Sequence, residues 1–275
     1  MKLINKLMTE GNEIRENPTY NTIGKTYDTT RKADLEITRL LTECLSPKPN
    51  GKYLDIACGS GNYTTALHKQ NIDICGIEIS EEMLSKARKK SPDISWLQGD
   101  AKKIPAENNS FDGAICTLAT HHIKNIKQAY LEAFRVIKKG KFIIFTATPE
   151  QMKQYWLWEY FPKMMENGSA VMHRFTEHED ALKNAGFTNI TKKPFFVTNN
   201  LQDWFLQSGK YRPEVYLDES VRAGISSFHL STNENEINLG LAKLKNDIES
   251  GNIKKIIDEY ESSVGDYCFI VGEKL

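Results

Sequence analysis

The 275-residue sequence has no excess of either charge, because 36 Lys and Arg residues are balanced by 36 Asp and Glu residues. A protein that holds nucleic acid through its phosphates usually carries a basic excess, so this balance argues against such a partner. Long apolar runs are also missing: no stretch of eighteen apolar residues could span a bilayer. The first ten residues contain no apolar core of signal-peptide length. We therefore expect a cytoplasmic protein that does not enter a membrane.

Cysteine is sparse and shows no pattern, with five residues and no Cys-x-x-Cys pair. An odd count without the spacing of a disulfide framework favours a reducing compartment. Cys75, Cys116 and Cys268 lie in apolar runs typical of strands, where a thiol behaves as a small apolar side chain. Acids and histidines do not gather at metal-ligand spacing, so we expect no metal site.

The most informative stretch is at residues 52–64, which read KYLDIACGSGNYT. A short β-prone run ends in the small-residue cluster 57–61, and a helical stretch follows. Strand, tight glycine turn and helix form the nucleotide site in the first unit of a doubly wound α/β sheet. Glycine lets the backbone approach a ligand, and the helix N-terminus offers unpaired N–H groups to an anionic group. The acid Glu78, which closes the next apolar run, stands where a ribose diol would be held.

The rest of the chain continues the α/β alternation. Five β-prone runs alternate with helical stretches and predict a parallel, right-handed doubly wound sheet: 53–56, 72–79, 94–97, 111–118 and 141–147. Beyond residue 148 the pattern changes to an aromatic and Met-rich segment, 149–176. A helix at 177–185 and a strand at 190–197 follow, then a mostly helical, polar stretch at 200–262 and a last strand at 267–271.

Four motifs in this order resemble those of class I S-adenosylmethionine-dependent methyltransferases: LDIACGSG at 54–61, GIEIS at 76–80, QGDA at 98–101 and FDGAI at 111–115. The resemblance implies a Rossmann-like α/β fold with a seven-stranded, mostly parallel sheet, an N-terminal helical segment and a helical cap or lid. Segment 1–48 would fold over the cofactor site and 49–148 would form the S-adenosylmethionine-binding core. Segment 149–275 would complete the sheet and carry substrate-cap insertions at 149–176 and 200–262.

The resemblance also implies which residues hold S-adenosylmethionine. They lie in the N-terminal segment or at and just after the ends of the first four strands: Tyr27, Arg31, Asp55, Ala57, Cys58, Gly59, Gly61, Glu78, Ile79, Asp100, Ala101 and Thr117. Asp55 and the turn would surround the methionine part, Glu78 would bind both ribose hydroxyls, and Arg31 would pair with the carboxylate. Ile79 and Asp100 would contact the adenine, Ala101 would offer its N–H and Thr117 its carbonyl. Each role has a plainer alternative. Asp55 can cap the loop, Asp100 can cap a helix, and Arg31 can be a charge exposed to solvent.

A nicotinamide or flavin site is the nearest alternative on such a sheet. Its fingerprint requires a third glycine where the helix packs on the strand, and Thr64 stands there instead. Ala57 occupies a position where the methyltransferase family usually has glycine, which is a mild departure. The turn therefore favours a methyl donor over a dinucleotide.

The acceptor should lie beside the loop 117–123 after the fourth strand. Histidine is a suitable base near neutral pH, so His121 or His122 is a candidate for catalysis, with His122 favoured; the pair can also merely shape the loop. The aromatic segment 155–175 is either the acceptor's wall or core packing, and 200–262 is expected to cover the site as a lid.

Taken together, these features predict methyl transfer from S-adenosylmethionine to a small-molecule O, N or C nucleophile by in-line displacement, leaving S-adenosylhomocysteine. The loop lacks the Asn/Asp-Pro-Pro-aromatic run of many nucleic-acid amino methyltransferases, which favours a small molecule. The alternatives are an RNA- or protein-directed methyltransferase and a non-catalytic S-adenosylmethionine-binding protein. The acceptor and the oligomeric state stay open at this point.

Overall fold

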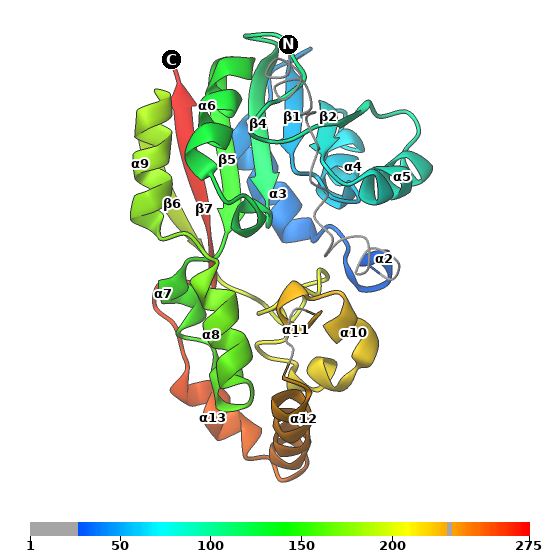
Figure 1. Ribbon diagram of the computed structural model, residues 1–275, viewed down its shortest axis with the longest axis vertical. Coiled ribbons are helices and arrows are strands. Elements are labelled where there is room, and N and C mark those ends of the chain that lie inside the picture. Colours follow the sequence, from blue (N-terminus) through cyan, green and yellow to red (C-terminus); the bar gives the residue numbers. More distant parts are fainter. Residues whose placement is uncertain (1–26, 230–232) are drawn as a thin grey trace, which may run out of the picture.

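The computed structural model describes residues 27–229 and 233–275. Its centre is a seven-stranded sheet in the order β3-β2-β1-β4-β5-β7-β6 (Figure 1). The strands are β1 (Lys52–Ile56), β2 (Asp73–Glu78), β3 (Trp96–Gln98), β4 (Phe111–Thr117), β5 (Ile137–Thr146), β6 (Thr188–Phe195) and β7 (Tyr267–Lys274). β7 runs antiparallel to both of its neighbours, and the other pairs are parallel. The predicted seven-stranded, mostly parallel sheet is confirmed.

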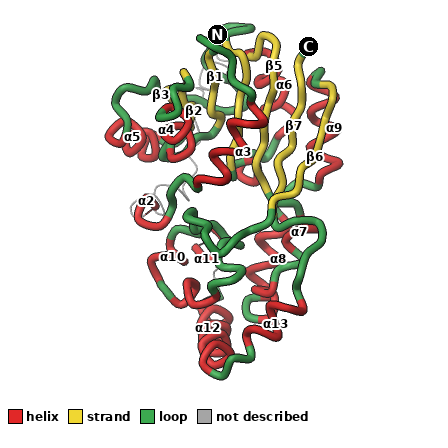
Figure 2. The backbone as a smooth tube through the Cα atoms, turned by 180° about the vertical axis from the view of Figure 1, so that it is seen from behind, coloured by secondary structure: helices red, strands yellow, loops and turns green. Residues whose placement is uncertain are grey.

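Helices cover both faces of this sheet. α3 (Leu35–Leu45), α4 (Asn62–His68) and α5 (Glu81–Lys90) lie on one face, and α6 (Ile126–Val136) and α9 (Phe175–Ala185) on the other (Figures 1 and 2). Successive residues of β4 belong to the hydrophobic clusters on opposite faces of the sheet: Ala114 packs with α6 and Ile115 packs with α3. A parallel sheet buried on both faces requires such continuous apolar runs.

Local capping fixes where two of these helices begin. Asp34 accepts hydrogen bonds from the N–H groups of Glu36 and Ile37, at 2.9 and 3.0 Å, and starts α3. Ser80 caps α5 through its hydroxyl, and two acids follow in the first turn. Side-chain acceptors at these positions satisfy N–H groups that the helix itself cannot pair. The capping places Asp34 and Ser80 near the carboxyl edge of the sheet, where the site is built.

A second, helical lobe lies at the carboxyl ends of the parallel strands (Figure 1). Its elements are α7 (Pro149–Met152), η2 (Trp156–Glu159), α8 (Pro162–Ala170), η3 (Pro213–Leu217), α10 (Glu219–Ala223), α11 (Ser226–His229), α12 (Glu234–Glu249) and α13 (Ile253–Glu259). One apolar cluster runs from α3 and the sheet into this lobe. α10 and α11 lie toward the sheet, whereas α12 and α13 lie at the far end. Within the described residues, no helix is long and apolar enough to cross a membrane.

Candidate active site

The glycine turn between β1 and α4 has an unusual backbone. Ala57, Gly59 and Gly61 all take the left-handed conformation, with φ of 57°, 57° and 74°. Glycine adopts this region at low cost, and a Cβ on Gly61 would collide with the Trp96 ring. Cys58 packs its side chain toward the Trp96 cluster, so its contribution to the turn is backbone. The turn therefore needs small residues for both its conformation and its packing.

Asp55 lies at the end of β1, only 2% exposed. One carboxylate oxygen, Oδ2, accepts a hydrogen bond from the Thr64 hydroxyl at 2.6 Å, while Oδ1 is buried without a partner in the described part of the chain. Burial raises the pKa of Asp55 to about 7, with a further contribution from the Glu78 charge, although the Thr64 hydrogen bond opposes it. A buried polar atom without a partner is costly, so Oδ1 is suited to a ligand that donates a proton or carries positive charge.

Glu78 lies at the end of β2 and faces the same turn. Its carboxylate accepts three backbone N–H groups, from Gly59 at 3.0 Å, Ile79 at 2.9 Å and Ser80 at 3.0 Å. Burial raises the pKa of Glu78, and the three hydrogen bonds partly counteract that rise. The carboxylate is thus fixed beside the glycine turn, at the strand end where the resemblance implies a ribose.

The remaining residues predicted to bind the methyl donor lie near the ends of β3 and β4. Asp100 accepts the N–H of Lys102 at 2.9 Å and pairs with its ammonium at 3.2 Å, and it caps a turn rather than a helix. Ala101 is partly buried in that turn. The hydroxyl of Thr117 is buried and has no partner among the residues described, and Leu118 after it has a left-handed φ of 54°. The backbone therefore turns sharply where the donor and acceptor sides meet.

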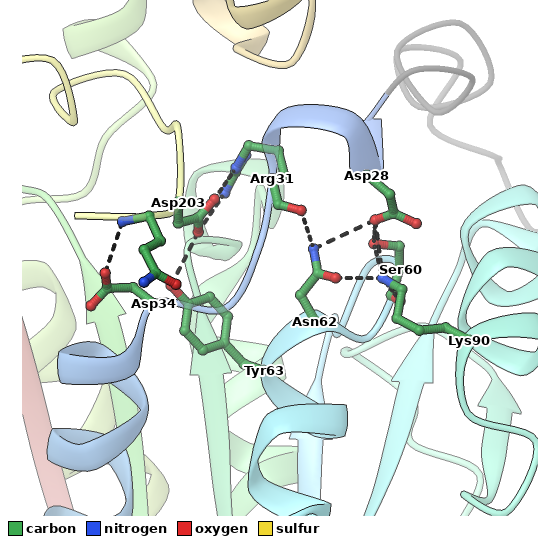
Figure 3. Close-up of polar contacts among 9 residues, drawn as sticks. Asp28, Arg31, Asp34, Ser60, Asn62, Tyr63, Lys90 and Asp203 are labelled. Carbon is green, nitrogen blue, oxygen red and sulfur yellow. Dashed lines mark hydrogen bonds and ion pairs between the residues drawn. The ribbon is translucent and has the colours of Figure 1, made fainter. Parts of the chain in front are cut away.

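Residues 28–31 are tied down over the glycine turn. α2 (Tyr27–Thr30) carries Asp28, which accepts from the Ser60 hydroxyl at 2.5 Å and from the Lys90 ammonium at 3.1 Å (Figure 3). Asn62 donates from its amide to the backbone carbonyl of Arg31 at 3.0 Å. The backbone of Tyr27 begins α2, but its side chain lies outside the described part of the structure.

Arg31 is not a solvated charge. Its guanidinium donates to Asp203 from Nε at 2.5 Å and from Nη2 at 3.3 Å, and the Tyr63 hydroxyl reaches the same carboxylate at 3.1 Å. Asp203 belongs to the stretch between β6 and η3, and Tyr63 belongs to α4. The sequence does not reveal this pairing, because 172 positions separate its two partners.

A small cavity opens at the carboxyl ends of β4 and β5. Its lining is apolar with a few polar groups: Arg31, Leu118, His121, Thr146, Ala147, Met172, Phe205, Leu206, Gly224, Ile225, Ser226, Ser227 and Tyr267. Apolar walls with a few placed polar groups are typical of small-molecule sites. Arg31 and Leu118 join this cavity to the donor side.

The histidine pair lies in η1 (Thr120–His122), with the two ring centroids 3.9 Å apart. Burial lowers the pKa of His122 to about 4 and that of His121 well below its usual range, and the Arg31 charge contributes to both. Both rings are therefore neutral at pH 7, and the lowered pKa makes each a weaker base than an exposed imidazole. His121 lines the cavity, which makes it the stronger candidate of the two, whereas the sequence favoured His122.

The aromatic segment after β5 is mainly core. Tyr155, Trp156 and Phe161 are at most 1% exposed, and the Trp156 indole donates to the Lys210 carbonyl at 3.1 Å. Met172 is the residue of this segment that lines the cavity in the described structure. Six more wall residues lie within 205–227, whereas α12 and α13 of the same insertion lie away from the sheet. The aromatic segment thus supports the residues that form the wall.

Comparison with known proteins places this geometry in a family. Residues 54–145 match the methyltransferase domain family. A solved structure of a putative methyltransferase from an antibiotic biosynthesis pathway of Anabaena variabilis is 30% identical, with a TM-score of 0.81, covering 90% of this chain and 99% of that one.

Curated relatives match over a shorter stretch. A demethylmenaquinone methyltransferase of Paenarthrobacter aurescens is 24% identical over 52% of this chain, and a ubiquinone/menaquinone biosynthesis C-methyltransferase of Rickettsia prowazekii is 36% identical over 35%. These matches span 56% and 44% of the two relatives, so about half of each curated relative is covered. Together with the full-length structural match, they show that the chain belongs to the class I S-adenosylmethionine-dependent methyltransferases.

Proposed function

We propose that the protein transfers the methyl group of S-adenosylmethionine to a small molecule bound in the cavity. The observation that carries this proposal is the junction of two sites at one sheet edge. The glycine turn, Asp55 and Glu78 form one site, and the cavity of thirteen residues forms the other. Arg31 and Leu118 lie where they meet. Ligands of open α/β sheets bind at this carboxyl edge.

Three residues support S-adenosylmethionine as the donor. The unpaired Oδ1 of Asp55 fits a cationic or proton-donating part of the methionine moiety, and the fixed carboxylate of Glu78 fits two ribose hydroxyls. Arg31 would bind the cofactor carboxylate. When bound, S-adenosylmethionine would supply a methyl group whose carbon a nucleophile attacks in line, with S-adenosylhomocysteine as the leaving group. The protein's main contribution is to hold the acceptor atom in that line.

The cavity favours an acceptor with an apolar body and at least one polar group. Phe205, Leu206 and Ile225 supply apolar walls, while Ser226 and Ser227 supply hydroxyls. His121, which is neutral at pH 7, would take the proton from an acceptor that must lose one. The curated relatives named above act on quinone precursors by their names, which supports a small, partly apolar acceptor. The five free cysteines support a cytoplasmic location.

A thermal-shift titration with S-adenosylmethionine tests the donor site first. Binding to the native state must raise the apparent melting temperature, by an amount that grows with ligand concentration. No shift at millimolar ligand would overturn the proposal. A methyl-transfer screen of a metabolite extract with isotope-labelled donor then tests the transfer. A labelled small molecule supports it, whereas label found only on RNA or protein, or binding without any transfer, contradicts it.

A further inference from the structure

Asp203 joins three segments that are far apart in the sequence. It lies between β6 and η3 with only 1% of its surface exposed. Its two carboxylate oxygens accept from Arg31 in the N-terminal segment and from the hydroxyl of Tyr63 in α4 (Figure 3). A charge buried to this degree is retained at a cost unless it is paired and hydrogen-bonded, and Asp203 is both.

The neighbouring backbone strengthens the same connection. The Gln202 N–H donates to Asp34 at 2.9 Å, and the Trp204 N–H donates to the carbonyl of Thr30 at 3.3 Å. On the other side, residues 28–31 are bound to the glycine turn through Ser60 and Asp28, and to the start of α4 through Asn62 and the Arg31 carbonyl. An unbroken series of polar contacts thus runs from the glycine turn through Arg31 to residues 202–204.

This series ends at the acceptor cavity. Phe205 and Leu206, immediately after it, form part of the cavity wall, and Arg31 also lines the cavity. We propose that Asp203 is a positioning residue that holds Arg31 at the junction of the donor site and the acceptor cavity, and that donor binding thereby orders the wall at residues 203–206. The inference rests on the proposed function, because it takes S-adenosylmethionine as the ligand that Arg31 receives.

The variant Asp203→Asn tests this role without an identified acceptor. The amide keeps the shape of the side chain but removes the charge that orients the guanidinium. We expect the dissociation constant of S-adenosylmethionine, measured by isothermal titration calorimetry, to rise about tenfold or more. Tyr63→Phe removes a single hydrogen bond to the same carboxylate and should give a smaller loss in the same direction, and it serves if Asp203→Asn does not fold.

Asp247→Asn is the matched control. Asp247 is also buried, at 7% exposed, and accepts from a tyrosine hydroxyl, Tyr160, at 2.9 Å and from Asn252 at 2.9 Å. It lies in α12, at the end of the lobe far from the sheet. This variant should lose stability as well, yet bind S-adenosylmethionine within about twofold of the wild type.

Hydrogen exchange separates positioning from mere stability. In the wild type, S-adenosylmethionine should slow amide exchange at the glycine turn 57–61 and also at residues 203–206. In Asp203→Asn the slowing should persist at 57–61 and disappear at 203–206, while Asp247→Asn keeps both. Unchanged affinity and retained slowing in Asp203→Asn overturn this inference alone. A wild-type protein that does not bind S-adenosylmethionine overturns the proposed function and the inference with it.

Discussion

The donor side and the acceptor side of the site are built in different ways. The proposed donor side consists mainly of residues at or just after the ends of β1, β2, β3 and β4. Much of it acts through the backbone, as in the N–H groups that donate to Glu78. The acceptor side is formed by side chains from strand ends, the N-terminal segment and residues 205–227. The first depends on short local motifs, and the second on contacts between segments far apart in the chain.

This difference teaches which parts of such an enzyme can change independently. A glycine turn with left-handed residues tolerates few replacements, because its backbone conformation and its contact with Trp96 both require small residues. The acceptor walls are held from behind by the aromatic core of the lobe, through contacts such as that from Trp156 to the Lys210 carbonyl. Wall residues can therefore vary while their support stays, which is how one fold hosts many acceptors.

The largest expected effect is a loss of S-adenosylmethionine affinity when Glu78, on the donor side, is replaced. Glu78→Ala removes the acceptor of three backbone N–H groups and the proposed ribose contact, so the dissociation constant of S-adenosylmethionine should rise about a hundredfold or more. Calorimetric titration measures it. Glu236→Ala is the control, since Glu236 also accepts two backbone N–H groups, from Lys163 and Met164, in the helical lobe. Equal affinities in the two variants would show that Glu78 has no role in binding.

A second prediction concerns the base at the junction. His121→Ala should lower kcat by about a hundredfold at unchanged donor affinity if the acceptor must lose a proton. Because the pKa of His122 is about 4 and that of His121 is also well below its usual range, neither ring titrates near pH 6.5. The wild-type kcat should thus show no histidine limb between about pH 5.5 and 8. His122→Ala is the matched variant, and near-wild-type turnover in both would exclude a histidine base.

The accuracy of the sequence-based predictions also differs between locally encoded features and features that depend on distant contacts. β1 to β4 lie within two residues of their predicted bounds, because strong apolar periodicity marks them. β5 begins at Ile137, four residues before its prediction, since the polar Lys138 and Lys139 conceal a strand that continues directly from α6. β6 is an edge strand with mostly exposed residues, which weakens its signal in the same way.

Some residues of the site are also predictable from local motifs, and others are not. Motif order identifies Asp55 and Glu78, and the structure places both at the glycine turn. No local pattern could join Arg31 to Asp203, because sequence periodicity carries no information about pairs so far apart. For the same reason, the aromatic segment at 155–175 suggests a wall from its composition, although tertiary packing makes most of it core.

A moderate effect should be confined to the acceptor side. Met172 is half-buried and lines the cavity, so Met172→Ala enlarges the cavity without opening a hole in the core. Once an acceptor is known, its KM should rise about fivefold while the donor dissociation constant stays within about twofold. Met164→Ala, from the fully buried part of the same segment, should mainly lower the melting temperature. A donor affinity that falls with Met172→Ala would contradict the separation of the two sides.

The smallest effect tests the backbone of the donor side at Ala57. Its φ of 57° costs an alanine about 1 kcal/mol relative to glycine, whereas glycine's larger freedom in the unfolded chain returns part of that difference. Ala57→Gly should therefore raise the free energy of unfolding by about 0.5 kcal/mol, measured by urea denaturation, at unchanged donor affinity. Ala66→Gly, in α4 with an ordinary helical backbone, should lower it by about 1 kcal/mol. Opposite signs at two alanines nine positions apart can arise only from the left-handed turn, so two losses would mean that the turn does not hold this conformation in solution.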